Sequence, residues 1–183
     1  LPVFLPLIGA IIAGLFGRVL GARNSQIVSV TLMGASAVLA VILFHNVIVD
    51  GDVRQVQIFE WISSGAFDVN WAIRVDELTA VMMFVVTIVS FLVHVYSIGY
   101  MSHDPHIPRF FAYLSLFTFF MLTLITSDNF LQLFFGWEGV GLASYLLIGF
   151  WYKRPAANAA AIKAFVVNRV GDFGFALGIL AIF

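Results

Sequence analysis

Cysteine is absent from the chain, and charged residues are scarce. Without thiols there is no disulfide bond, no thiolate metal site and no cysteine-ligated iron–sulfur cluster. Charged side chains make up only 10% of the 183 residues and the formal net charge is −1, so a nucleic-acid-binding surface is not indicated. A soluble domain of this length would need far more polar surface, which argues against the water-soluble classes.

Apolar residues dominate instead. The chain is 62% hydrophobic, contains 20 phenylalanines and has a mean hydropathy of +1.03. Its long runs without charge predict an all-α integral membrane bundle formed as a single transmembrane domain. About six transmembrane helices are expected, over residues 2–17, 26–48, 77–101, 108–126, 129–152 and 158–183. Pro108 suits the first turn of the fourth helix and Asn158 the N-cap of the sixth.

The two ends of the chain predict a fragment. The sequence begins with Leu-Pro rather than methionine and stops within the apolar run "GILAIF". The first apolar run precedes Arg18, whereas a cleavable signal peptide carries its basic residues in front of its apolar run. We therefore expect a piece of a longer protein, cut inside its last helix.

The charges of the connecting segments alternate along the chain. Arginine or lysine marks the segments after the first, third and fifth spans, at Arg18, Arg23, Arg109, Lys153 and Arg154. Aspartate marks the segments after the second and fourth spans. The positive-inside rule then places the basic segments in the cytoplasm or matrix and the N-terminus outside, in the periplasm or intermembrane space.

The one long connection, residues 49–75, predicts a β-hairpin on the outer face. Within it "AFDVNWAIRV" alternates strictly between apolar and mostly polar residues, as a strand with one covered face does. The segment "VQIFEWI" precedes it, and "SSG" between them suits a turn. An irregular amphipathic loop is the alternative interpretation.

Glu138 is the deepest charge in the sequence. At helical rise it lies about 15 Å from Asp128 and about 22 Å from Lys153, which is near the middle of a hydrocarbon layer of about 30 Å. Burying a carboxylate there costs on the order of several kcal/mol, so it indicates a function, such as a protonatable relay or a charge-pair switch. Nearby glycines, Gly136 and Gly139, would let a neighbouring helix or water approach closely. Alternatively, a neutral glutamic acid could bond to a neighbouring helix as structural support.

Arg169 and Asp172 lie near the middle of the sixth span. Their spacing of three places them on one face of a helix, where they can pair. The pair either takes part in charge movement or only fixes helix packing by neutralising itself. The glycines of the same helix, at positions 171, 174 and 178, predict close packing against a neighbour.

Two further ionisable side chains are candidates for proton transfer. Lys163 lies about one turn from the inner end of its span, where it either snorkels to the interface or changes protonation when desolvated. His94, in "FLVHVYSIGYM", is either a structural donor or a proton relay. His103 and His106 flank Asp104 in a short loop that offers too few ligands, so no metal site is expected. This set of ionisable groups, without a redox centre, favours ion or proton movement.

The strings "LFFGWEGVGLASYLLIGFWY" and "AAIKAFVVNRVGDFGFALGIL" closely resemble chain 5 (subunit L) of the proton-pumping NADH:quinone oxidoreductases, respiratory complex I. "YSIGYMSHDPHIPRFFAYLSLFTFFM" and "TSDNFLQLF" are similar to the same family, and the resemblance extends over essentially the whole chain. It covers the N-terminal portion, roughly the first third, of the family's length. Related chains occur in multisubunit Na⁺/H⁺ antiporters and membrane-bound hydrogenases, which usually lack the "GWEGVG" form.

The resemblance implies an antiporter-like subunit of the membrane arm, of which this chain holds the first inverted-repeat half. It implies that Glu138 pairs with a lysine of a later helix, beyond Phe183, and that Arg169 and Asp172 match the family's "RxGD" pattern. Lys163 matches a basic position on the same helix. NADH, FMN, iron–sulfur clusters and quinone would be bound by other subunits, with no cofactor in this chain.

The partners implied are the lipid bilayer and other membrane-arm subunits, especially the neighbouring antiporter-like one. The membrane would be the bacterial plasma membrane or the mitochondrial inner membrane. Two readings compete with proton translocation coupled to electron transfer. One is a subunit of a multisubunit Na⁺/H⁺ antiporter or membrane-bound hydrogenase, and the other is a purely structural segment of the arm.

Overall fold

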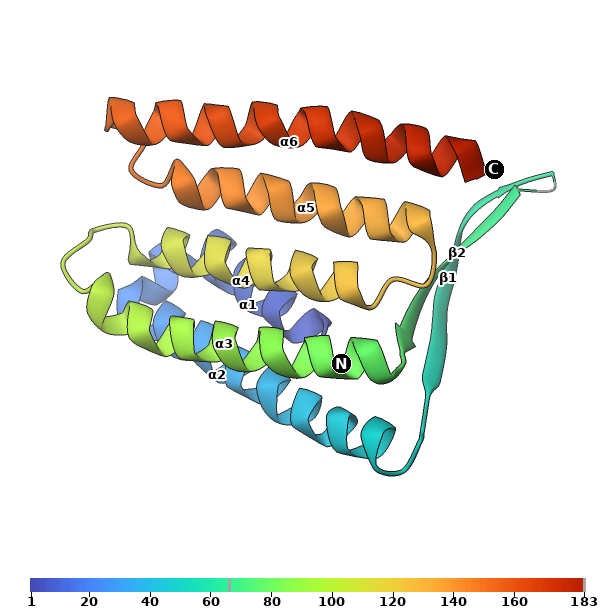
Figure 1. Ribbon diagram of the computed structural model, residues 1–183. Helices are drawn as coiled ribbons and strands as arrows, with labels where there is room; N and C mark the ends of the chain where they lie inside the picture. Colours follow the sequence, from blue (N-terminus) through green and yellow to red (C-terminus); the bar gives the residue numbers. More distant parts are fainter. Residues whose placement is uncertain (66, 183) are drawn as a thin grey trace.

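A helical bundle with one β-hairpin makes up the computed structural model, which describes residues 1–65 and 67–182 (Figure 1). The described residues form six helices and one antiparallel sheet. The elements are α1 (Phe4–Leu15), α2 (Gly17–Ile48), β1 (Arg54–Ser64), β2 (Phe67–Val75), α3 (Glu77–Tyr100), α4 (Ile107–Ile125), α5 (Phe130–Ile148) and α6 (Pro155–Ile182). The predicted all-α membrane bundle with a β-hairpin is confirmed, and the placement of the hairpin on the outer face stays a prediction.

The first two predicted spans form a helical hairpin. By length and composition, five helical segments of the described chain could cross a membrane, and the first, Phe4–Ile48, includes both α1 and α2. The chain reverses near Gly21, whose φ of 75° is in the left-handed region that glycine tolerates. Beyond the turn α2 runs back along α1, so that the Ser36 hydroxyl donates to the carbonyl of Pro2 at 2.7 Å. The six predicted spans therefore correspond to the six helices.

Several predicted helix ends are tested by the structure. Pro108 does lie in the first turn of α4, where a missing N–H costs nothing. The prediction for Asn158 is wrong, because α6 begins at Pro155 and Asn158 lies within its first turn. Proline, which suits the first helical position, starts the helix earlier. The Asn158 amide instead donates to the carbonyl of Tyr152 at 2.6 Å.

The third helix has a well-formed N-terminal cap. The Asp76 carboxylate accepts the backbone N–H of Thr79 at 2.9 Å, as expected for a residue at this end of the span. This hydrogen bond holds the pKa of the Asp76 carboxyl below its ordinary value of 3.8. The Arg74 guanidinium, 3.3 Å away, adds to the effect. The cap sets where the hairpin ends and the membrane helix begins.

The hairpin rests on the connection between α4 and α5. Its strands pair from Arg54 with Val75 to Ser64 with Phe67, with two register shifts. The N–H of Arg74 donates to the carbonyl of Thr126 at 3.0 Å, and every residue of β1 is exposed while β2 is partly covered. Of the two strands of the hairpin, β2 is thus the one that packs on the bundle.

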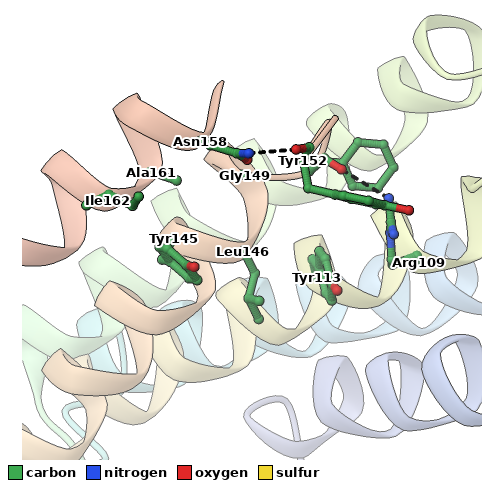
Figure 2. Close-up of a pocket in the computed structure, with 10 residues that line it drawn as sticks. Arg109, Tyr113, Tyr145, Leu146, Gly149, Tyr152, Asn158, Ala161 and Ile162 are labelled. Carbon is green, nitrogen blue, oxygen red and sulfur yellow. Dashed lines mark hydrogen bonds between the residues drawn. The ribbon is translucent and has the colours of Figure 1, made fainter. Parts of the chain in front are cut away.

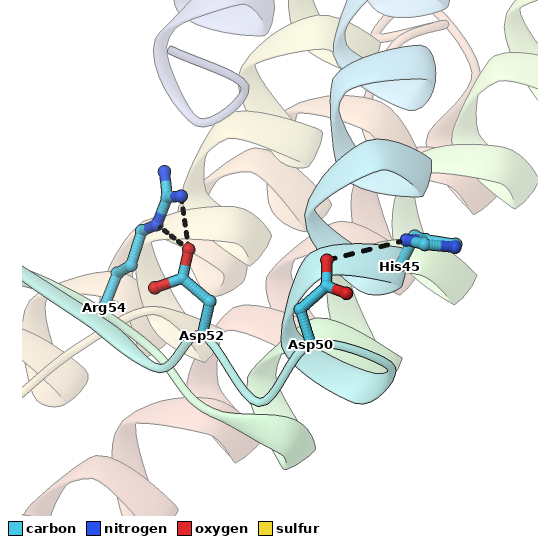
Figure 3. Close-up of polar contacts among 4 residues, drawn as sticks. All are labelled: His45, Asp50, Asp52 and Arg54. Carbon is cyan, nitrogen blue, oxygen red and sulfur yellow. Dashed lines mark hydrogen bonds and ion pairs between the residues drawn. The ribbon is translucent and has the colours of Figure 1, made fainter.

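At the base of the hairpin, two ion pairs flank the glycine turn that leaves α2 (Figure 3). His45 lies 3.9 Å from Asp50, and the Arg54 Nε donates to Asp52 at 2.7 Å. The hydrogen bond from Arg54 lowers the pKa of the Asp52 carboxyl. All four side chains are exposed, so these pairs contribute little to stability.

Glycines bring α5 very close to α4. A Cβ added at Gly136 would lie 2.6 Å from the Cα of Leu124, and one added at Gly139 would overlap the ring of Phe120. This close approach is what the glycines around Glu138 predicted. By contrast, added Cβ atoms at Gly171, Gly174 and Gly178 meet nothing within 4 Å among the described residues, so the close packing predicted there is not observed. The reason is that α6 packs on α5 through a different face, on which Asp172 is buried.

Candidate functional site

The candidate site lies where α5 and α6 run side by side (Figure 1). Glu138 is about 12 Å from the start of α5 and about 15 Å from its end at helical rise. Arg169 is about 21 Å from the start of α6 and about 20 Å from its end. Both charges are therefore held in the middle of membrane helices, and the short α5–α6 connection brings them to similar depth.

Arg169 is shared by two carboxylates. Its Nη1 forms an ion pair with Glu138 Oε2 on α5, and the same nitrogen lies 3.5 Å from Asp172 Oδ2 one turn further along α6. The guanidinium also lies over the ring of Phe165, 4.6 Å from its centroid. A guanidinium bound on two sides and stacked on a ring is held in a defined position, with the two acids as alternative partners.

Asp172 is the most buried member of the cluster. Its side chain is 8% exposed, against 22% for Glu138 and 43% for Arg169. The second oxygen, Oδ1, accepts the indole N–H of Trp137 at 2.8 Å. Both oxygens of Asp172 are therefore engaged, one by a charge and one by a neutral donor, as a carboxylate removed from water requires.

The cluster has one positive and two negative groups. With both acids ionised its formal charge is −1, so a proton or a second cation is needed to make it neutral. A site in a low-dielectric layer favours neutrality, because separated charges there are costly. On charge alone, the cluster can therefore accept one further positive charge.

His94 and Lys163 lie apart from this cluster. His94 on α3 is fully buried, with Nδ1 2.7 Å from the carbonyl of Ser90 and Nε2 3.1 Å from the hydroxyl of Ser115 on α4. In a neutral ring, Nδ1 donates to the carbonyl and Nε2 accepts from Ser115. Lys163 is exposed on α6, and no carboxylate among the described residues lies within salt-bridge distance of it. The structure brings together three of the five predicted residues.

Two features of the cluster go beyond the sequence prediction. The predicted pair of Arg169 and Asp172 is observed, but Arg169 also pairs with Glu138, for which only a lysine beyond Phe183 was expected. The expected lysine stays a prediction. Trp137 was not predicted, although its position next to Glu138 was a signal, since an indole N–H within a membrane helix needs an acceptor. Among residues 1–65 and 67–182, no group of three or more His, Asp or Glu side chains could hold a metal ion.

Two family models match the chain. Residues 61–111 match "NADH-Ubiquinone oxidoreductase (complex I), chain 5 N-terminus", and residues 127–183 match "NADH:quinone oxidoreductase/Mrp antiporter, TM". The second match contains every member of the Glu138 cluster. The first contains His94 and β2.

Curated relatives are similar over almost the whole chain. NADH-ubiquinone oxidoreductase chain 5 of Arabidopsis thaliana is 59% identical over 181 residues, which is 99% of this chain and 27% of the relative. NADH-quinone oxidoreductase subunit L of Rickettsia conorii is 52% identical over 180 residues, 98% of this chain and 27% of the relative. The chain thus spans about a quarter of the length of the relatives it matches.

One solved structure has the same fold. A chain of the membrane-bound sulfane sulfur reductase, an archaeal respiratory membrane complex, superimposes with a TM-score of 0.79 over 97% of this chain and 35% of that chain. The sequence identity is 21%, so this likeness concerns the fold alone. The two family models and the extended similarity to the plant and bacterial relatives agree with each other: the chain belongs to the chain 5 (subunit L) family of the NADH:quinone oxidoreductases.

Proposed function

We propose that this chain is part of a membrane-arm subunit of an NADH:quinone oxidoreductase that translocates protons when electrons pass from NADH to quinone in other subunits. The observation that carries the proposal is the cluster of Glu138, Arg169 and Asp172 at mid-depth in two membrane helices. The relatives' names support the complex. Because the chain spans about a quarter of their length, the activity belongs to the longer protein and its partners.

In this mechanism Arg169 alternates between two acids. When Glu138 takes up a proton its ion pair with Arg169 is lost, and the guanidinium stays with Asp172, which is already 3.5 Å away. Charges about 4 Å apart interact by about 4 kcal/mol at an effective dielectric of about 20, so one protonation step strongly changes its neighbours. A lysine supplied beyond residue 183 would compete with Arg169 for Glu138. A change of charge elsewhere in the membrane arm would shift this competition, and a proton would move laterally between the ionisable groups.

The remaining candidates would act before or after this step. Lys163 lies six residues before Arg169 on the same helix, about 9 Å away along its axis. The Lys163 amine can exchange a proton with groups at the basic end of the bundle. His94 is connected to Ser115 on α4 and would relay protons only through hydroxyl groups or water. We place the basic connections in the cytoplasm or matrix, by the positive-inside rule.

The decisive experiment is Glu138→Gln in the complete complex. We expect NADH oxidation by a water-soluble acceptor to be unchanged and protons pumped per NADH to fall, because glutamine cannot gain or lose a proton. Glu60→Gln on the exposed strand β1 is the matched control, and it should pump normally. Wild-type rate and stoichiometry in Glu138→Gln would refute the relay role. A lower yield of assembled complex, with normal turnover in the complexes that do assemble, would favour the purely structural alternative.

Charge neutralisation tests how Arg169 is shared. If Arg169 and Asp172 only neutralised each other, the double variant Arg169→Gln, Asp172→Asn would pump better than either single variant. Since Arg169 also pairs with Glu138, we expect the double variant to remain as impaired as Arg169→Gln. Recovery in the double variant would contradict the three-membered cluster.

A cation/proton antiporter subunit is the second candidate, favoured by the description of the model that matches residues 127–183. This candidate differs from the first in the subunits with which the protein would assemble. Affinity purification of the full-length protein would then bring down no NADH-binding or quinone-site subunits, and transport would proceed without NADH.

A further inference from the structure

One end of the bundle is strongly basic. The segments that join α1 to α2, α3 to α4 and α5 to α6 all lie at the end opposite the hairpin (Figure 1). These segments and the first residues of the helices that follow them carry Arg18, Arg23, Arg109, Lys153 and Arg154, against a single acid, Asp104. Tyrosines and a tryptophan, which favour the boundary between lipid and water, lie among them at Tyr113, Trp151 and Tyr152. This end is therefore at the level of the lipid headgroups.

A cavity of about 690 Å³ opens between these segments. Arg18 lines it from the turn into α2, His106 and Arg109 from the start of α4, and Tyr152 from the connection to α6. Its floor is made of small residues, and a Cβ added at one of them, Gly17, would lie 2.6 Å from Pro108. The walls are thus in firm contact, and two arginines from distant parts of the chain line one space.

Arg109 is held in place without a ligand. Its Nη2 donates to the carbonyl of Phe150 at 3.0 Å, and the guanidinium lies 4.6 Å from the centroid of the Phe150 ring and 5.3 Å from that of Tyr152. Its buried Nε has no hydrogen-bond partner among the described residues. The buried Nε is closed to an outside anion, but among the described residues the Nη groups have the Phe150 carbonyl as their one hydrogen-bond partner. A fixed guanidinium with free Nη donors is well suited to bind a phosphate, since little conformational entropy is lost on binding.

The only acid nearby does not neutralise these arginines. Asp104 accepts the indole N–H of Trp151 at 2.9 Å and the backbone N–H of His106 at 2.8 Å. In the described part of the chain, no carboxylate lies within 4 Å of the Arg18 or Arg109 guanidinium. Their positive charge is therefore available to an anion from outside the bundle.

A second, more apolar space adjoins the basic cavity. Arg109, Tyr113 and Tyr152 also line a second cavity of about 440 Å³, which continues between α4, α5 and α6 past Leu146 and Ile162 (Figure 2). Arginine thus stands between a polar space at the headgroup level and an aromatic and aliphatic groove that leads into the bundle. A free inorganic anion would use only the first of these spaces.

We propose that this pair of cavities binds an anionic phospholipid, with its phosphodiester between Arg18 and Arg109 and its glycerol and upper acyl chain along Tyr113 and Leu146. Basic pockets between membrane helices at the cytoplasmic or matrix surface suit anionic headgroups in general, because that leaflet is the negatively charged one. The guanidinium groups offer the planar donors that phosphate oxygens prefer. The lipid would join the α1–α2 hairpin to the α5–α6 pair, which carries the charge cluster.

The test is the electron-microscopic structure of the complete complex in nanodiscs. In a mixture of phosphatidylcholine and phosphatidylglycerol, we expect density for a phosphate with acyl chains between Arg18 and Arg109. The variant Arg18→Gln, Arg109→Gln should lose it. Arg23→Gln is the matched control, because Arg23 is exposed at the same end of the bundle but does not line the cavity. Arg18→Gln alone, which removes an exposed side chain, should reduce the density even if the double variant fails to assemble.

Different outcomes separate the possible sources of the anion. Equal density in pure phosphatidylcholine would show that the headgroup charge is not recognised and would overturn the proposal. Density for a bare phosphate in lipid-free detergent with inorganic phosphate, without any acyl chain in nanodiscs, would replace the lipid by a free anion. A protein segment filling the cavity, or unchanged lipid density in the double variant, would likewise refute it. None of these readouts depends on proton pumping.

Discussion

Two glycines of α5, Gly136 and Gly139, are predicted to respond differently when the α4 residue that each contacts is shortened to alanine. A Cβ at Gly136 would lie 2.6 Å from Cα and 2.7 Å from N of Leu124, which are backbone atoms. Since carbon atoms pack best at about 3.5–4.0 Å, α4 and α5 would have to separate by about 1 Å. A Cβ at Gly139 would instead overlap the ring of Phe120, a side chain that can be shortened.

The expected cost follows from two opposing effects. Overpacking costs typically about 1–3 kcal/mol. Replacing glycine by alanine inside a helix recovers about 1 kcal/mol. Gly136→Ala and Gly139→Ala should therefore each destabilise the bundle by up to about 2 kcal/mol. If the whole loss appears in the unfolding rate, that shortens the lifetime at a given temperature by up to about 30-fold.

A double-mutant cycle distinguishes the two sites. Phe120→Ala leaves a cavity and is destabilising alone, but the double variant Gly139→Ala, Phe120→Ala should be more stable than the sum of the single effects. Leu124→Ala should give no such relief to Gly136→Ala, because the clash is with the backbone. The measurement is the half-life of NADH:quinone activity of the purified complex at one elevated temperature, together with the yield of assembled complex.

Gly9→Ala is the control for the substitution itself. Gly9 also lies at a helix–helix contact, but its added Cβ would be 3.6 Å from the nearest atom, in ordinary contact. We expect its half-life to equal or exceed that of the wild type. If Gly136→Ala were as stable as Gly9→Ala, or if Leu124→Ala rescued it, the close α4–α5 contact derived above would be refuted.

Three further predictions concern single hydrogen bonds. Trp137→Phe removes the indole donor to the α6 carboxylate at 2.8 Å, so proton pumping should fall while assembly is retained; unchanged pumping would contradict a role for this bond. His94→Gln keeps a polar side chain near Ser115 and should assemble better than His94→Leu, measured as complex yield, because the leucine leaves buried polar groups unpaired. Asp76→Ala removes the cap to Thr79 and should cost about 1 kcal/mol. Because the folded pKa is lowered, this contribution is present above the ordinary value of 3.8 and is lost only as pH falls through the lower folded pKa, so the difference in half-life should be constant above about pH 5.

Much of the fold followed from the sequence. The six apolar segments, the alternation of charge between their connections and the strict alternation within residues 67–75 depend on local composition, and all three have their counterparts in the structure. Helix ends were less certain, as Asn158 illustrates, because several residues near Pro155 could each start a helix. The sequence predicted the break between the first two helices between residues 17 and 26, but only the structure shows that the chain reverses near Gly21, because a single left-handed φ leaves no trace in composition.

The individual members of the charge cluster were likewise evident from the sequence, because an ionisable side chain far from any helix end is costly whatever surrounds it. Their grouping was only partly evident. The pairing of Arg169 with Asp172 follows from a spacing of three on one helix. The ion pair with Glu138 and the indole bond of Trp137 join two helices, and they depend on how α5 and α6 are rotated about their axes.

The sequence by itself determined that the chain is an integral membrane bundle, where its apolar helices lie, and which side chains carry charge into them, because each depends on composition and spacing along one helix. Only the tertiary structure decided which of those charges meet. It joins Glu138 to Arg169 and leaves His94 between α3 and α4, and it closes a basic cavity from Arg18 and Arg109. The physical reason is that contacts between helices depend on their rotation and separation, which small residues such as Gly136 and Gly139 set through packing across the interface.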